Sequence, residues 1–489
     1  METSNIPGGA LRITLANASQ YLVIALFYMI VTKTNILTET DIGTLSILSF
    51  LASVFSLLTV LALPMALTKF TSEKLGKKQK EEAAAIQKTI TKTVLALSIA
   101  GFAILALSSQ LLSQYLWNNP EYAILLILNF AFAFLSNITS LCNSTLQALY
   151  LFGKMATITI TFIVSSRIIA IALAFLHMGV TGVIIGYITG SIIAITLAIN
   201  FLRGKLPKTT TNMPLKPLLS FSFPLFVSSI TLLVLTWADV VIINSLTGDS
   251  SLTGIYYIVI SSVGTLSILY MPMMTTIFPA LSAHHGLKKP ESISNILRTT
   301  SRIIIYIIFP SCIGLAIIAP TALTFFYGAG YAKGATPLTI LSITTIIIAL
   351  NALFSTALTA TGKTGQILKI NIAAATSTIL TLIALVPPLE TTGAALARLT
   401  TQTIATALAA YALSKEIKIH LDKEALWKAA LATTAMVPLL LTIELVISTR
   451  LTTTQTLITE LLTATAIYAI AIYILKALKN QDFDLLKQA

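Results

Sequence analysis

Long apolar runs, separated by short polar stretches, follow one another along nearly the whole chain of 489 residues. A helix that crosses a bilayer core needs about 20 consecutive apolar residues. The runs predict helices at 10–32, 42–68, 89–112, 122–150, 156–177, 180–202, 217–247, 252–282, 300–326, 336–361, 365–387, 392–414, 425–448 and 454–477. The pattern therefore predicts an all-α polytopic membrane protein with about fourteen transmembrane helices.

The composition agrees with a chain whose solvent is lipid. Hydrophobic residues make up 56% and charged residues 10%, whereas soluble domains carry about 25% charged residues. The net charge of +13 would suggest nucleic acid in a soluble protein, but here loops facing an anionic leaflet explain it. Cys142 and Cys312 lie in apolar runs, and the four histidines lack metal-ligand spacing. We therefore predict the bilayer as a partner, and no nucleic acid, metal or cofactor.

The positions of Lys and Arg give the orientation, because cytoplasmic loops are enriched in both. With a cytoplasmic N-terminus, 26 of the 31 basic residues fall in the two termini and the cytoplasmic connections. The outer connections hold Lys33, Lys333 and Arg450, and the spans hold Arg167 and Arg398. This alternation predicts a multi-pass protein of the plasma membrane with both termini in the cytoplasm.

Short motifs recur in the same order after a shift of about 210 residues, which predicts an internal duplication. The matching pairs are Pro64-Met65 and Pro272-Met273, Thr91-Lys92 and Ser301-Arg302, Ser144-Thr145 and Ser355-Thr356, Gly153-Lys154 and Gly362-Lys363, and Thr181-Gly182 and Thr392-Gly393. Each copy holds six helices, an even number, so the two bundles should be related by a pseudo-two-fold axis along the membrane normal.

The duplication predicts the domain organisation. It gives an N-terminal six-helix lobe at 1–205, a basic cytoplasmic connector at 206–216, and a C-terminal six-helix lobe at 217–415. An appended helix pair and a cytoplasmic tail occupy 416–489. Two parallel repeats of this kind are typical of membrane transporters, and the substrate site of a transporter built in this way is expected between the two halves.

Several loose motifs of the second half agree in order and spacing with one superfamily. They are TWADVVIINSLTGDSSLTGIYYI, IFPALSAHHG, FFYGAGYAKGATPL, TGKTGQILKI and TTGAALAR. With them the chain resembles the MATE-like superfamily of multidrug, oligosaccharidyl-lipid and polysaccharide exporters, and most of all its polysaccharide-biosynthesis flippases. The resemblance implies two six-helix bundles that open alternately to each side, helices 1, 2, 7 and 8 along the cleft, and a lipid-linked sugar as cargo.

The first predicted helix departs from neighbouring members of that superfamily. Drug exporters coupled to protons or sodium commonly carry an acidic residue there, and peptidoglycan-precursor flippases carry charged residues. This helix offers only Asn17 and Gln20, which we include among the candidate substrate-binding residues. The departure counts against drug–cation antiport and against peptidoglycan-precursor transport.

Charged side chains inside spans are costly, which makes them functional candidates. Arg167 lies eleven residues into its predicted helix, or ~16 Å, near the bilayer centre. A guanidinium there could bind phosphate bidentately, or it could tie helices through carbonyls or an acid. Arg398 could extend a cationic path or snorkel outward. Asp239 could pair with a moving basic residue, bind a coupling cation, or lie in a wet outer mouth.

Lys154 and Lys363 occupy equivalent positions in the two repeats and complete the set of candidates. With Lys69, Arg298 and Arg302 they could attract an anionic head group to a cytoplasmic mouth, or they could act only as topology signals. Glu460, in the appended pair, is interpreted as structural. Pro64, Pro272 and Pro279 are expected to bend the predicted helices 42–68 and 252–282.

No enzyme motif is present, and the longest connection, about twenty residues between helices 2 and 3, is too short for a catalytic domain. The leading hypothesis is a flippase that moves polyprenyl- or dolichyl-(pyro)phosphate-linked oligosaccharide from the cytoplasmic to the outer leaflet. A MATE-type cation-coupled drug or metabolite antiporter is one alternative. The other is a non-transporting scaffold whose partners are glycan-assembly enzymes.

Overall fold

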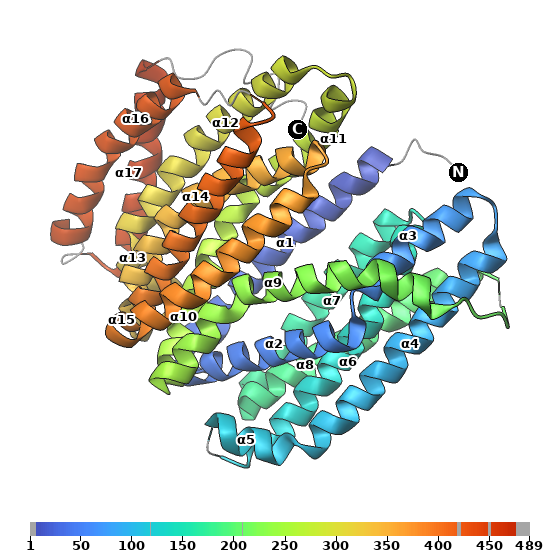
Figure 1. Cartoon of the computed structure of the whole chain (residues 1–489). Coiled ribbons are helices and arrows are strands. Elements are labelled where there is room, and N and C mark those ends of the chain that lie inside the picture. Colours follow the sequence, from blue (N-terminus) through green and yellow to red (C-terminus); the bar gives the residue numbers. More distant parts are fainter. Residues whose placement is uncertain (1–5, 118, 208, 418–421, 448–450, 476–489) are drawn as a thin grey trace. The chain divides into compact units, whose positions relative to one another are not determined.

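The computed structural model describes residues 6–117, 119–207, 209–417, 422–447 and 451–475, and the side chains of 6–18, 423 and 447 lie outside that description. Every regular element of the described residues is helical (Figure 1). The prediction of an all-α polytopic protein is confirmed, since the part of the chain that the structure describes contains 11 helical segments long and apolar enough to cross a membrane. The chain divides within α9 into two compact units, residues 1–237 and 238–489.

The first unit contains α1 to α8 and the beginning of α9. The bounds are α1 (Ile6–Lys33), α2 (Glu39–Val60), α3 (Leu63–Gly76), α4 (Lys80–Leu107), α5 (Ser109–Trp117), α6 (Tyr122–Ala148), α7 (Phe152–Leu173), the π-helical turn η2 (Ala174–Met178), α8 (Gly179–Leu202) and α9 (Leu215–Thr247). Helix α6 packs against α2, α3, α4 and α8, and α7 packs between α1 and α8. Helix α6 is therefore the centre of this unit.

Polar side chains help to fix α6 in that position. The buried Asn137 amide donates hydrogen bonds to Thr59 Oγ1 of α2 at 2.8 Å and to Ser98 Oγ of α4 at 2.9 Å. About two helical turns earlier on α6, the Asn129 amide donates a hydrogen bond to the Leu48 carbonyl at 2.8 Å. In an apolar surrounding an unpaired amide would be costly, so these bonds select one arrangement of the three helices.

The second unit continues from α9. The bounds are α10 (Ser250–Gly264), the 3₁₀ turn η3 (Thr265–Leu269), α11 (Met271–Gly286), α12 (Pro290–Ile317), α13 (Ala319–Tyr327), η4 (Ala329–Gly334), α14 (Ala335–Ala360), α15 (Thr364–Ser414), α16 (Lys423–Thr442), the π-helical turn η5 (Ile443–Ile447) and α17 (Thr453–Ile474). Helix α14 packs against α10, α11, α12 and α15, as α6 does against its neighbours in the first unit.

The appended helices α16 and α17 lie side by side and attach to α12 and α13 (Figure 1). An apolar cluster joins Ile305 and Tyr306 of α12 to the small residues Ala425, Ala429 and Ala432 of α16. These alanines let the two helices approach closely. The hydroxyl of Tyr468, on α17, donates to the carbonyl of Tyr306 at 2.8 Å.

The order of elements repeats along the chain, as the recurring motifs predict. Each helix from α9 to α15 begins 208 to 213 residues after its counterpart among α1 to α7. The left-handed residues Lys78 and Lys288 end α3 and α11 at equivalent positions. The axis that would relate the two copies stays a prediction.

Two of the apolar segments, 152–202 and 364–414, are 51 residues long. A straight helix of that length would span ~75 Å, far more than a bilayer core of about 30 Å. Both turn back on themselves, at His177 with φ 60° and at Glu390 with φ 49°. These turns agree with the predicted helix pairs 156–177 with 180–202 and 365–387 with 392–414. The total of fourteen spans stays a prediction.

The bounds of two predicted elements differ from the structure. The connection of about twenty residues between predicted helices 2 and 3 is mostly helical, since α3 ends at Gly76 and α4 begins at Lys80. Hydrophobicity locates the apolar core of a helix, and these helices continue beyond it as charged turns. The predicted continuous helices 42–68 and 252–282 are interrupted, directly before Pro64 and Pro272.

Candidate functional site

Arg167 of α7 lies between two aromatic rings of the first unit. Its guanidinium carbon is 4.9 Å from the ring centroid of Phe27, on α1, and 4.2 Å from that of Tyr187, on α8. Its Nε has no hydrogen-bond partner among the described residues, and the ion pairs found in that part of the chain do not include it. The rings hold the guanidinium by its faces and leave its N–H edge able to donate hydrogen bonds.

The close packing of α7 and α8 brings Arg167 to this place. A Cβ on Gly190 would lie 2.6 Å from Cβ of Ser166, and a Cβ on Gly186 would lie 2.6 Å from the backbone nitrogen of Ala170. Only glycine permits this approach, and Tyr187 follows directly after Gly186 on the same helix. The ring of Tyr187 is in turn 5.4 Å from that of Phe132, on α6.

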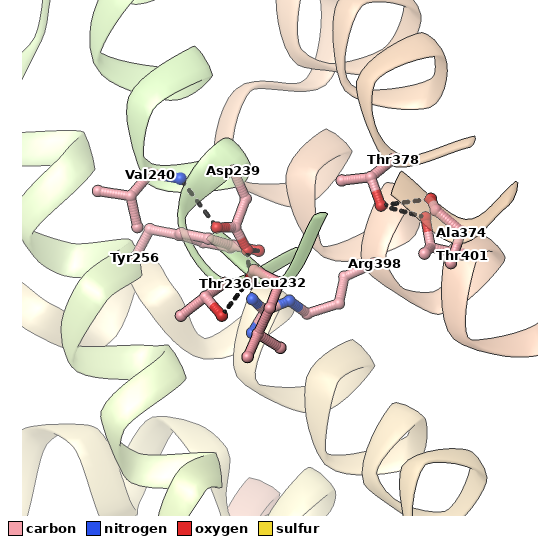
Figure 2. Close-up of polar contacts among 9 residues, drawn as sticks. All are labelled: Leu232, Thr236, Asp239, Val240, Tyr256, Ala374, Thr378, Arg398 and Thr401. Carbon is pink, nitrogen blue, oxygen red and sulfur yellow. Dashed lines mark hydrogen bonds and ion pairs between the residues drawn. The ribbon is translucent and has the colours of Figure 1, made fainter. Parts of the chain in front are cut away.

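A second group of polar side chains lies in the second unit, where Asp239, Arg398 and Tyr256 meet (Figure 2). A terminal guanidinium nitrogen of Arg398 is 3.1 Å from Oδ2 of Asp239. The Tyr256 hydroxyl donates to the same oxygen at 3.2 Å. Asp239 and Tyr256 are buried, with 3% and 0% of their surface exposed. The carboxylate is therefore neutralised within the fold.

Three helices supply this group: Asp239 comes from α9, Tyr256 from α10 and Arg398 from the second arm of α15. The two arms of α15 are tied by a hydrogen bond of 3.1 Å between the hydroxyls of Thr378 and Thr401, which lies one turn beyond Arg398 (Figure 2). The sequence predicted Asp239 and Arg398 as separate candidates, and the structure brings them together as one ion pair.

The equivalent lysines of the two repeats have different neighbours. Lys154 lies 5.0 Å from the ring centroid of Phe201, on α8. Lys363 instead forms an ion pair of 2.7 Å with Glu416. Lys69 resembles Lys154, since its ammonium lies 4.0 Å from the ring centroid of Phe221.

Arg298 and Arg302, the other predicted cations of the second repeat, both face Asp422. Each guanidinium is 3.5 Å from Oδ2 of that carboxylate, which is 2% exposed and caps the beginning of α16. This pairing attaches the appended helices to α12. Like Lys363, the two arginines therefore have an acidic partner within the described residues.

Gln20 is partly buried on α1, and the side chain of Asn17 lies outside the described residues. The sequence interpretation did not single out Phe27, Tyr187 and Tyr256, although they contact the candidates. One signal was available for Tyr187, because Gly186 and Gly190 flank it with helical spacing. Residues far apart in the sequence otherwise give no sign that they meet.

The described residues define a class of protein: a polytopic α-helical membrane protein with buried or partly buried charged side chains in both of its units. The chain is similar in structure to the lipid II flippase MurJ in an inward closed conformation. That match has a TM-score of 0.72 at 17% identity and covers 96% of this chain and 98% of that one. The MATE multidrug transporter DinF-BH matches with a TM-score of 0.62 at 17% identity, covering 85% of this chain and 96% of that one.

A third solved structure is a MOP superfamily transporter from Pyrococcus furiosus, with a TM-score of 0.59, 13% identity, and coverage of 85% of this chain and 98% of that one. At these identities the likeness shows the fold alone. No curated protein matches the sequence significantly. The family of polysaccharide biosynthesis proteins matches residues 30–336, more than half of the sequence. The chain belongs to that family.

Proposed function

We propose that this protein is a flippase that carries a lipid-linked oligosaccharide from the cytoplasmic to the outer leaflet of the plasma membrane. The cargo is a polyprenyl- or dolichyl-(pyro)phosphate-linked sugar, and it crosses by alternating access. Membership of the polysaccharide biosynthesis family supports this proposal, as does a fold shared with a flippase of lipid II.

The unpaired Arg167 carries the proposal. A (pyro)phosphate that enters an apolar helical protein needs a counter-charge, and the guanidinium between Phe27 and Tyr187 supplies one without an acid of its own. Its N–H edge would bind the phosphate oxygens, while Gln20 and Asn17 of α1 would bind sugar hydroxyls. Lys154 and Lys363 would attract the anionic head group at the cytoplasmic surface.

The ion pair of the second unit counts against a cationic cargo. A drug–cation antiporter needs an acid that can meet its cargo, and Asp239 is held by Arg398 and Tyr256. Of the two arginines within the predicted spans, Arg398 is neutralised by this pair, and Arg167 is available for an anion. In this proposal Asp239 and Arg398 remain together and fix α9 and α10 against α15.

The proposed cycle uses the predicted domain organisation. The lobes 1–205 and 217–415 would open alternately to the two sides of the membrane, with both termini in the cytoplasm. The connector 206–216 would join the lobes, and the helices of 416–489 would accompany the second one. The recurring order of helices supports two lobes of equal design.

Transport in proteoliposomes tests the proposal. Purified protein would be reconstituted with a fluorescent polyprenyl-pyrophosphate-linked sugar, and its movement between leaflets would be followed by chemical quenching of the outer pool. Arg167→Ala should lower cargo affinity by about 10- to 100-fold, since charge-assisted hydrogen bonds contribute about 1.5–3 kcal/mol. Arg167→Lys should retain partial activity, because it keeps the charge and loses the bidentate geometry.

Arg203→Ala is the matched control, because Arg203 is an exposed arginine at the end of α8, and transport should stay unchanged. Normal transport by Arg167→Ala would remove that residue from the mechanism. Binding of cationic dyes, with release driven by protons or sodium, would replace the flippase with the antiporter. If the protein moved no lipid-linked sugar between the leaflets, and the glycan were nevertheless lost in cells without the protein, the scaffold alternative would be favoured.

A further inference from the structure

The appended helix pair buries a carboxyl group that the proposed transport mechanism does not use. Glu460, on α17, has 0% of its surface exposed, and no amide, hydroxyl or basic group among the described residues donates to its carboxyl oxygens. An isolated carboxylate is very costly in an apolar interior, whereas the protonated acid is not. A carboxyl in this position therefore favours a bound proton.

A second carboxyl lies close to the first. Glu444 lies on the π-helical turn η5, which packs against α17, and its carboxyl meets that of Glu460 through a side-chain hydrogen bond and an electrostatic interaction. It accepts a hydrogen bond of 2.6 Å from the hydroxyl of Thr321, on α13. Unlike Glu460 it is partly exposed, so it can exchange protons with water. A π-helical turn within a helix is frequent at functional sites.

The elements packed against α17 bring little other charge to this place. Besides Glu460, the titratable and charged groups that the described residues of α12, α13, α16, η5 and α17 carry are Glu291, Arg298, Arg302, Tyr306, Cys312, Tyr327, Glu424, Lys428, Glu444, Tyr468 and Tyr473. Arg298 and Arg302 face Asp422, at the beginning of α16. Glu424 and Lys428 form an ion pair with each other at the opposite end of α16. The hydroxyl of Tyr468 donates to a backbone carbonyl. Arg450 belongs to the connection between η5 and α17 and lies outside the described residues, as does the side chain of Lys423.

We propose that Glu444 and Glu460 form a proton-binding site in the appended helix pair. A proton leaves hydronium, is accepted by the Glu444 carboxylate, and is passed to a carboxyl oxygen of Glu460, where one O–H bond forms. The reverse transfer releases it to water. A proton suits the site better than a metal ion, because the described residues contain no group of three acidic, histidine or cysteine side chains.

The proton site is independent of the cargo, so its test needs no lipid-linked sugar. Infrared difference spectra of the full chain in lipid bilayers would be recorded while the pH is raised. The wild type should lose a protonated-carboxyl band as Glu460 ionises. Glu460→Gln, which has the same shape, should lose the intensity of one carboxyl per molecule. Glu444→Gln should move the transition of Glu460 to lower pH, since it removes a neighbouring negative charge.

Glu424→Gln is the control, because that side chain is exposed and already paired with Lys428, and its spectra should equal those of the wild type. Identical spectra for Glu460→Gln and the wild type would overturn the proposal. A band that disappears at constant pH when sodium replaces potassium would also overturn it, since the site would then hold a metal cation.

Discussion

Arg167 and Arg398 both lie in long apolar segments, yet their surroundings differ. Arg398 meets a carboxylate at 3.1 Å, and the two charges cancel. Arg167 meets the faces of two aromatic rings, which stabilise a cation without removing its net charge. A site for an anionic head group requires the second kind of surrounding, because a paired guanidinium would have to lose its partner first.

The role of the aromatic rings can be tested at Tyr187. Tyr187→Phe keeps the ring face above Arg167, so transport should remain close to that of the wild type. Tyr187→Leu removes a cation–π contact of about 0.5–2 kcal/mol, so the apparent affinity for the lipid-linked sugar should fall by about 2- to 30-fold. Equal losses in both variants would show that the hydroxyl matters and the ring face does not. Cargo titration in proteoliposomes measures the effect.

The ion pair of the second unit gives a prediction on stability. Arg398→Met leaves the Asp239 carboxylate buried without its cation, which should destabilise the fold by about 3–5 kcal/mol. The double variant Asp239→Asn with Arg398→Met should recover most of that loss, because no isolated charge remains. Unfolding in detergent, followed by thiol labelling of the free Cys142 and Cys312, measures the change.

The exposed ion pair between Lys77 and Glu73 supplies the comparison. Lys77→Met should change stability by less than about 1 kcal/mol, since exposed pairs are screened by water. If the losses of stability caused by the two single substitutions simply add in the double variant, the assigned pairing of Asp239 with Arg398 is contradicted.

The sequence located the charged candidates but not their partners. Arg167, Asp239 and Arg398 are conspicuous because charge is rare in apolar runs. That Asp239 meets Arg398, and that Arg167 meets Tyr187, depends on how helices pack. Hydrophobic periodicity shows which residues enter a span and does not show which spans touch.

At the scale of elements, the predicted helices were located well and their ends were not. The apolar run 122–150 corresponds closely to α6, whereas the run 42–68 contains the end of α2, the left-handed pair Leu61 and Ala62, and part of α3. Apolar composition continues across that interruption, so hydrophobicity alone could not reveal it. Pro64 was the available signal, since proline is favoured in the first turn of a helix.

The α7–α8 contact predicts a sensitivity to small changes in volume. Gly186→Ala places a methyl group against the backbone of Ala170, so the helices must separate, at a cost of about 1–3 kcal/mol. Gly365→Ala, on α15, meets no atom within 4 Å and should be neutral or slightly stabilising. Thermal unfolding of the purified variants compares them. A neutral Gly186→Ala would contradict the close approach.

At the scale of the whole molecule, the repeated order of helices contrasts with their different charges. The first unit leaves Lys69, Lys154 and Arg167 beside aromatic rings. In the second unit Lys363, the counterpart of Lys154 in the recurring motifs, pairs with Glu416, and Lys415 lies 4.3 Å from the ring centroid of Tyr411. The described cations with aromatic neighbours therefore concentrate in the first unit, where the proposed phosphate site also lies.

The two segments of 51 residues decide the topology of the molecule. If 152–202 crosses the membrane twice, Tyr150 and Lys205 lie on the same side, and His177 lies on the opposite side. All three residues are exposed, so cysteines placed there should be open to a reagent that cannot cross the membrane. Likewise, Lys363 and Lys415 should share a side, and Glu390 should lie opposite, in the segment 364–414.

Single cysteines at these positions, in a background with Cys142→Ala and Cys312→Ala, test the prediction in sealed cells or oriented vesicles. We expect Tyr150→Cys, Lys205→Cys, Lys363→Cys and Lys415→Cys to be labelled only from the cytoplasmic side, where positive loops are retained. His177→Cys and Glu390→Cys should be labelled only from outside. A single crossing of either segment would place its two flanking cysteines on opposite sides. The count would then be smaller than fourteen, and the two copies would no longer share an orientation. Labelling on the predicted sides would instead place the beginnings of α7 and α15, which match in the recurring order of helices, on the same side of the membrane, as a parallel duplication requires.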